Sequence, residues 1–208
     1  MSNRDPHLIE SVEELRGIVG EPIKQVPLKL WTRLEAEAID YIAASPLLIL
    51  STADAQGRQD ASPKGDLPGF AEVEDEGTLL IPDRPGNKLV MGLQNILANP
   101  RVGLLFMVPG TPETLRVNGS AELTRDPAVL ERLSARGKPA VLAVRVRVEE
   151  CFFHCAKAFL RSSLWKPESW PERRKISFGN MIAKRMGADG QVAGAIDEMV
   201  EQDNRENL

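Results

Sequence analysis

The chain has 208 residues, of which 42% are hydrophobic and 27% are charged, close to the average of a soluble globular protein. Its formal net charge is −4, and its lysines and arginines are scattered among acidic residues, so we expect no nucleic-acid partner. Its longest apolar runs fall far short of the roughly 20 residues that cross a bilayer, so we expect no membrane partner.

The two cysteines and the first residues of the chain indicate the compartment. Cys151 and Cys155 are four positions apart, and such low cysteine use fits a reducing cytosol better than an oxidising compartment. Residues 1–15 carry several charges and no apolar segment of a secretory signal. We therefore expect a cytoplasmic protein.

Two helices are predicted ahead of the first strand. A polar helix covers residues 11–18 and ends before Gly20. Apolar residues then recur with a helical period until Pro46 ends the pattern, at Trp31, Leu34, Ala38 and Ile42. We assign residues 1–29 to an N-terminal helical extension that packs on the outside of a larger body.

Short apolar or alternating segments predict six strands, at residues 47–53, 58–63, 78–82, 102–108, 114–124 and 142–148. The clearest is 114–124, in which apolar and polar residues alternate with a period of two. Helices are predicted after the third strand and, from Asp126 and Pro127 onwards, after the fifth. Because short strands joined by hairpins favour an antiparallel barrel, we predict such a barrel over residues 30–150, with flanking helices.

The segment after Glu149 reads as two or three helical pieces, broken at Pro167, Pro171 and residues 187–190. It has too few apolar positions to form a core of its own. We assign residues 151–208 to a helical C-terminal tail that packs on the barrel and on a partner subunit.

The segment 81–88 leaves a strand, turns tightly and is predicted to open a helix. A helix N-terminus suits a phosphate, because it carries unpaired N–H groups and the positive end of the helix dipole. Arg84 and Lys88 add positive charge, and arginine can hold phosphate oxygens in a bidentate fork. The alternative is that Asn87 only caps the helix while both cations stay in solvent.

Lys64 is a second candidate, because it lies among small residues at the end of a strand. It suits a ring carbonyl or a phosphate, and the alternative is an exposed lysine that pairs with Asp66.

A third candidate follows Cys151. If this stretch is helical, His154, Lys157 and Arg161 share one face and present a cationic stripe to an anionic ligand. The alternative is a solvated face with the neighbouring phenylalanines turned inward. Two cysteines and one histidine fall short of the four ligands of structural zinc, so we expect no metal site.

Three motifs carry a resemblance to a known superfamily: T-L-L-I-P-D-R-P-G-N at 78–87, N-I-L-A-N-P-R-V-G-L-L-F at 95–106 and L-R-V-N-G-S-A-E at 115–122. The tail segment C-F-F-H-C-A-K-A at 151–158, continuing to Arg161 and Trp165, is similar as well. Together they resemble the pyridoxamine 5′-phosphate oxidase superfamily of FMN-binding split barrels, in its bacterial branch of FMN-dependent enzymes. The resemblance runs from about residue 31 to 150 and implies a six-stranded antiparallel split β-barrel in the α+β class.

The resemblance also implies a homodimer with FMN at its interface, where both subunits line each site. By position it implies contacts with the flavin or its phosphate at Ala61, Ser62, Pro63, Lys64, Ile81, Pro82, Asn87 and Lys88, and a contact across the interface at Thr114. Arg84, His154, Lys157 and Arg161 are added to the cofactor site from charge and position.

Two features of the vitamin oxidases are not matched. Their Arg-Lys pair at the helix start reads Asn87-Lys88 here, and their C-terminal substrate motif, an arginine and a histidine after a tryptophan, has no counterpart in this tail. The resemblance therefore supports the flavin more than the oxidation of pyridoxamine phosphate.

From these features we expect an FMN-binding oxidoreductase that moves hydride or electrons between a reduced nicotinamide, or another small organic substrate, and FMN. No catalytic residue is assigned. Three alternatives stay open: a non-catalytic flavin store or sensor, a split barrel that handles a deazaflavin or haem, and an interaction protein that retains only the barrel.

Overall fold

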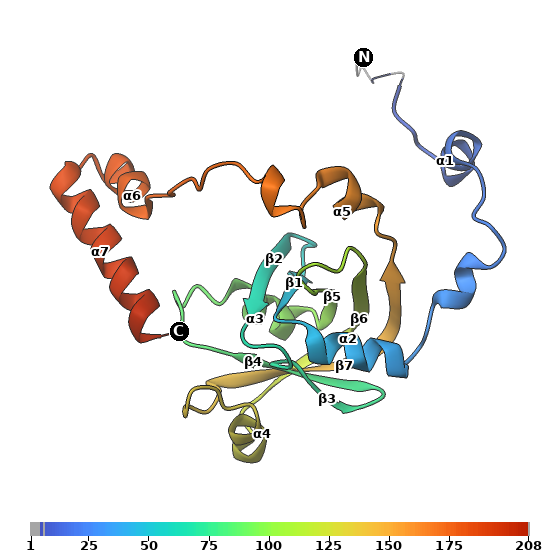
Figure 1. Cartoon of the computed structure of the whole chain (residues 1–208), viewed down its shortest axis with the longest axis horizontal. Coiled ribbons are helices and arrows are strands. Elements are labelled where there is room, and N and C mark those ends of the chain that lie inside the picture. The colour runs from blue at the N-terminus through green and yellow to red at the C-terminus, as the bar shows by residue number, and fades with distance from the viewer. Residues whose placement is uncertain (1–4, 6, 208) are drawn as a thin grey trace.

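The computed structural model describes residue 5 and residues 7–207; residues 1–4, 6 and 208, at the ends of the predicted extension and tail, lie outside the described residues. Within the described part, seven strands form one antiparallel sheet in the order β2-β1-β5-β6-β7-β4-β3. They are β1 (Leu47–Ala53), β2 (Gln59–Gly65), β3 (Glu72–Asp75), β4 (Thr78–Asp83), β5 (Arg101–Met107), β6 (Thr114–Thr124) and β7 (Leu142–His154). Figure 1 shows a strongly bent sheet, and the α+β split barrel predicted from the sequence is confirmed.

The helices lie between the strands and at both ends of the chain. They are α1 (Val12–Val19), α2 (Ala36–Ala44), α3 (Met91–Ala98), α4 (Pro127–Arg132), α5 (Lys157–Ser162), α6 (Phe178–Met186) and α7 (Gly190–Glu206), with short 3₁₀ helices η1 (Val26–Lys29) and η2 (Pro167–Ser169). None of the helices in the described part combines the length and the apolar character needed to cross a membrane.

The seventh strand, β3, was not predicted. It has only four residues, and its sequence E-V-E-D offers one apolar side chain, so it shows neither alternation nor an apolar run. Its order comes from pairing with β4, in which Glu72 lies opposite Leu80. A short, charged strand of this kind is typical of a sheet edge, where it discourages further pairing.

The last strand, β7, continues to His154, so the prediction of helix directly after Glu149 is wrong for residues 150–154. This stretch pairs with β6, with His154 opposite Thr114. Cys151 also exchanges two backbone hydrogen bonds with Trp31, at 2.8 and 2.9 Å. Burial, reinforced by the negative charge of Glu35, raises the pKa of the Cys151 thiol to about 11.

The main core lies inside the bend of the sheet. Alternate residues of β1, β5, β6 and β7 point into it and are at most 1% exposed: Leu48, Leu50, Leu104, Phe106, Leu115, Val117, Val144 and Val146. Helices α2 and α3 cover it with Ala38, Ile42, Leu93 and Ile96. Because burial of each large aliphatic side chain contributes about 1.5–3 kcal/mol, this cluster is the main source of stability.

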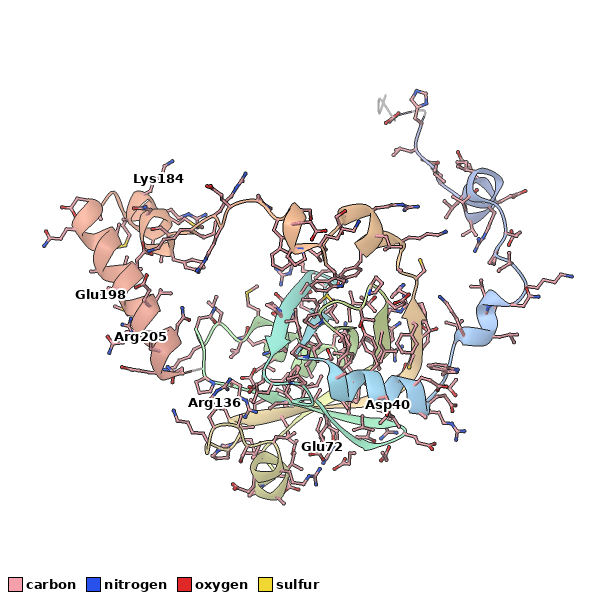
Figure 2. All side chains as sticks on the ribbon, viewed as in Figure 1. Asp40, Glu72, Arg136, Lys184, Glu198 and Arg205 are labelled. Atoms are coloured by element: carbon pink, nitrogen blue, oxygen red, sulfur yellow. The ribbon has the colours of Figure 1, made fainter. Side chains whose placement is uncertain are left out.

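Helices α6 and α7 form a hairpin beyond the barrel. The Asp197 carboxylate on α7 accepts hydrogen bonds from the Ser177 hydroxyl at 2.5 Å and from the Gly179 N–H at 2.8 Å, so it caps the start of α6. A side chain at Gly179 would overlap the carbonyl oxygen of Ala193, so the two helices cross in direct backbone contact. Figure 2 shows Lys184, Glu198 and Arg205 on this hairpin, to one side of the barrel.

The pairing of β6 with β7 shifts register between Asn118 and Gly119, where Glu149 is the extra residue of a β-bulge in β7. A Cβ at Gly119 would overlap the carbonyl oxygen of Arg147, so only glycine fits on β6 opposite this bulge. We expect Gly119→Ala to lower the free energy of unfolding by about 1–3 kcal/mol, measured by urea denaturation, because the clash is with backbone.

Gly103→Ala, on the neighbouring strand β5, is the matched control for Gly119→Ala. The methyl group added at residue 103 would have its nearest contact at 3.4 Å, an ordinary van der Waals distance. We therefore expect little change in the free energy of unfolding. Equal stability losses in the two variants would contradict the special role of the bulge.

Candidate functional site

A hollow of about 190 Å³ lies beside the ends of β2 and β4. Its lining is Pro63, Lys64, Gly65, Phe70, Pro82, Asp83, Arg84 and Pro85. Four residues predicted from the sequence therefore meet in one place: Pro63, Lys64, Pro82 and Arg84. The hollow combines cationic side chains with flat apolar ones, which is the composition of a small-molecule site.

The charges at the hollow are arranged in two groups. Lys64 Nζ lies 2.6 Å from Asp83 Oδ1, and both side chains are largely buried, with 23% and 16% of their surface exposed. Arg84 Nε lies 3.2 Å from Asp66 Oδ2, and Arg136 Nη1 lies 3.0 Å from Asp66 Oδ1. The alternative pairing of Lys64 with Asp66 is therefore not the one formed.

Asp66 is the most buried of these groups, with 4% of its side chain exposed. Burial alone would raise its pKa, but the Leu67 N–H, Arg136 and Arg84 together outweigh that effect and hold the pKa below its ordinary value. The carboxylate thus stays ionised and holds two arginines at one edge of the hollow.

Arg136 is a site residue that sequence reasoning missed. It lies between α4 and β7 with a φ of 51°, and it reaches Asp66 across 70 positions of the chain. No local pattern marks a pair of this separation, so only the folded chain reveals it.

The loop between β4 and α3 differs from the prediction. The helix begins at Met91, not at Asn87 or Lys88, since Lys88 and Val90 have φ angles of 60° and 47° that do not fit a helix. The Asn87 carboxamide oxygen accepts a hydrogen bond from the Leu89 N–H at 3.0 Å, which is a local turn and not a helix cap. Asn87 and Lys88 are exposed in this loop.

The N-terminus of α3 is close to a carboxylate of the same chain. A Cβ at Gly92 would lie 3.2 Å from Asp60 Oδ2, and the same carboxylate accepts a hydrogen bond from the Ser62 hydroxyl at 2.8 Å. A negative group here interacts favourably with the helix dipole. Ser62 is thus bonded to Asp60 beside the start of α3, and the phosphate contacts expected at residues 81–88 stay a prediction.

The other predicted residues are placed apart from the hollow. Ile81 is fully buried, and its side chain belongs to the main core. Thr114 and His154 face each other at the far end of the β6–β7 pair, while Lys157 and Arg161 are exposed on α5. Figure 1 shows α5 beyond the end of β7, on a different side from the loop that leads into α3.

His154 is in strand β7, so it does not share a helical face with Lys157 and Arg161. Burial lowers the pKa of its imidazole, and the positive charges of Arg116 and Lys29 lower it further. At neutral pH this side chain is therefore biased towards the neutral form.

A family model described as pyridoxamine 5′-phosphate oxidase matches residues 34–155 of the chain. The match spans the barrel and more than half of the sequence, and the chain belongs to the pyridoxamine 5′-phosphate oxidase family. No curated protein matches the chain.

Several solved structures are similar in fold. HupZ of Group A Streptococcus is 20% identical, with a TM-score of 0.48 over 58% of this chain and 93% of that chain. A proposed pyridoxamine 5′-phosphate oxidase of Lactobacillus delbrueckii is 26% identical, with a TM-score of 0.46 over 59% and 95%. An FMN-binding protein of Syntrophomonas wolfei is 12% identical, with a TM-score of 0.43 over 56% and 81%.

Replacing Asp66 by Asn is expected to lower the free energy of unfolding by about 2 kcal/mol at neutral pH, because two charge-assisted hydrogen bonds are weakened. The pKa of Asp66 is lower in the folded chain than its ordinary 3.8, so its stabilisation is complete above 3.8 and is lost as the pH falls towards the folded value. Urea unfolding from pH 7 downwards should show the difference between wild type and variant shrinking below about pH 4.

Asp40→Asn is the control for Asp66→Asn. Asp40 is exposed on α2 (Figure 2) and forms no ion pair with any residue that the structure describes. The Asp40→Asn variant should have the same dependence of stability on pH as the wild type. A wild-type-like profile for Asp66→Asn would show that the two arginines do not depend on this carboxylate.

Proposed function

We propose that this chain binds FMN and acts as an oxidoreductase. Its membership of the pyridoxamine 5′-phosphate oxidase family supports a flavin, since the resemblance drawn from its motifs implies that cofactor. The observation that carries the proposal is the meeting of Lys64, Arg84 and Pro82 at one hollow of the barrel.

The donor set of the hollow fits a flavin phosphate and ring. Lys64, Arg84 and Arg136 face two carboxylates, so the cluster keeps a net positive charge. Arginine and lysine donors suit phosphate oxygens. Pro63, Phe70 and Pro82 supply apolar surface for a planar ring.

FMN needs more space than this hollow offers. The hollow of about 190 Å³ lies below the roughly 300–1,000 Å³ of ordinary ligand pockets. We therefore propose that two copies of the chain complete each site, with Thr114, His154, Lys157 and Arg161 contributed by the partner. The helical tail from residue 151 would pack on the barrel and on that partner.

Bound FMN would supply the hydride or electron chemistry, and the residues of the chain would bind and orient it. The substrate class we propose is a reduced nicotinamide or another small organic molecule. A non-catalytic flavin store, and a split barrel for a deazaflavin or haem, are the alternatives to exclude.

The first test is the absorbance spectrum of the purified protein, with the mass of any released chromophore. Flavin bands and an FMN mass are expected, followed by bleaching on anaerobic addition of NADH or NADPH. A bound flavin that no reductant bleaches would favour a store. Colourless protein that does not quench the fluorescence of added FMN would overturn the proposal.

The phosphate role of the hollow is tested by Lys64→Gln and Arg84→Gln, each expected to weaken FMN binding by about tenfold or more, since a charge-assisted hydrogen bond contributes about 1.5–3 kcal/mol. FMN fluorescence quenching measures the affinity. Arg58→Gln is the control, because Arg58 is 78% exposed in the turn before β2 and pairs with Asp54. Equal affinity in all three variants would contradict the assignment.

A further inference from the structure

A second cationic cluster lies on the outer face of the β6–β7 pair, around the ring of Phe152. Lys29 Nζ lies 4.8 Å from the ring centroid and Arg116 Cζ lies 4.1 Å from it. The His154 ring is also near, with its centroid 4.8 Å from that of Phe152. Three basic side chains from η1, β6 and β7 therefore surround one aromatic ring.

The register of the two strands explains this arrangement. Arg116 is opposite Phe152, and Thr114 is opposite His154, so all four side chains share the outer face. Lys29 is tied to the same place because its ammonium group donates a hydrogen bond to the Phe153 carbonyl oxygen at 2.9 Å. The strand register and the Lys29 hydrogen bond thus bring the three basic side chains together.

The positive charge of this cluster is not balanced. Glu150 pairs with Arg116 at 2.7 Å, and no other carboxylate in the part of the chain that the structure describes forms an ion pair with Arg116, Lys29 or His154. Arg116 Nε is buried and has no hydrogen-bond partner. A buried donor without a partner is unfavourable, so the Glu150 carboxylate does not meet the full hydrogen-bonding capacity of this guanidinium.

We propose that Lys29, Arg116 and His154 form a binding site for a small anion, a phosphate or carboxylate group of a ligand. Two permanent cations attract the anion, the part of the Arg116 guanidinium that is exposed offers N–H donors, and His154 gains a proton when the anion binds. Burial is the largest cause of the lowered pKa of His154, and the positive charges of Arg116 and Lys29 lower it further. Anion binding does not depend on the flavin, whereas its assignment to a substrate rests on the proposed function.

The experiment uses the fact that the chain has only two histidines, His7 and His154. Imidazole NMR signals of the ¹³C-histidine-labelled protein are assigned with His7→Gln and followed through a pH titration. Inorganic phosphate should raise the pKa of His154 in a saturable manner, compared with sodium chloride of equal ionic strength, because a nearby anion favours the protonated ring. An unchanged titration in phosphate would overturn the proposal.

Arg116→Gln should abolish the saturable response to phosphate, and Lys29→Gln should weaken it. Lys29→Gln removes no ion pair, so it still tests the site if Arg116→Gln disturbs the strand by removing the ion pair with Glu150. Arg101→Gln is the matched control, because Arg101 lies on the same outer face and pairs with Glu149 at 2.7 Å. A wild-type response in both cluster variants would refute the site.

The titration is repeated after loading with FMN to identify the source of the anion. If FMN suppresses the response, the cluster binds the phosphate of the cofactor, and the assignment of that phosphate to Lys64 and Arg84 is wrong. If the response persists, the cluster serves a separate anionic ligand, which we would identify with the substrate. If FMN does not bind at all, the proposed function is wrong, and the response of His154 to phosphate still tests the cluster.

Discussion

The pairing of β6 with β7 connects every other part of the barrel. It runs from Thr114 opposite His154 to Thr124 opposite Ala143, and the bulge at Gly119 bends it. β5 pairs with the other edge of β6, and β4 pairs with the other edge of β7. The core residues inside the bend, the hollow near the end of β4 and the cationic cluster on the outer face are all positioned by this one ladder.

The two charged regions on this framework differ in how their charges are compensated. At the hollow, carboxylates hold Lys64, Arg84 and Arg136 in place, so a phosphate there would have to share these cations with Asp83 and Asp66. On the outer face, a single carboxylate serves the cluster around Phe152. The ion pairs at the hollow fix the orientation of its cationic side chains before a ligand binds. The cluster around Phe152 keeps an excess of positive charge that attracts an anionic ligand.

Much of the barrel could be predicted because its strands are buried on one face. The alternation in residues 114–124 is a direct consequence of that burial, and turn residues mark the hairpin between β1 and β2. The strand at residues 150–154 was missed because a short apolar run does not distinguish helix from strand without its pairing partner.

The site was predictable in part for a related reason. Lys64 and Arg84 stand out locally because each follows the end of a predicted strand. Arg136 and Lys29 reach their places through contacts across 70 and 124 positions of the chain, and nothing in their local sequence indicates these contacts. The start of α3 was misplaced because the sequence does not show that Lys88 and Val90 adopt left-handed backbone angles.

The two cysteines have opposite environments, although they are close in sequence. Cys151 is buried, with its thiol pKa raised to about 11, whereas Cys155 is exposed directly after His154. Since the thiolate is the reactive form, a maleimide dye at neutral pH would attach at Cys155 alone. The wild-type chain therefore offers a natural attachment point for a fluorophore, next to the end of β7 where the cationic cluster lies.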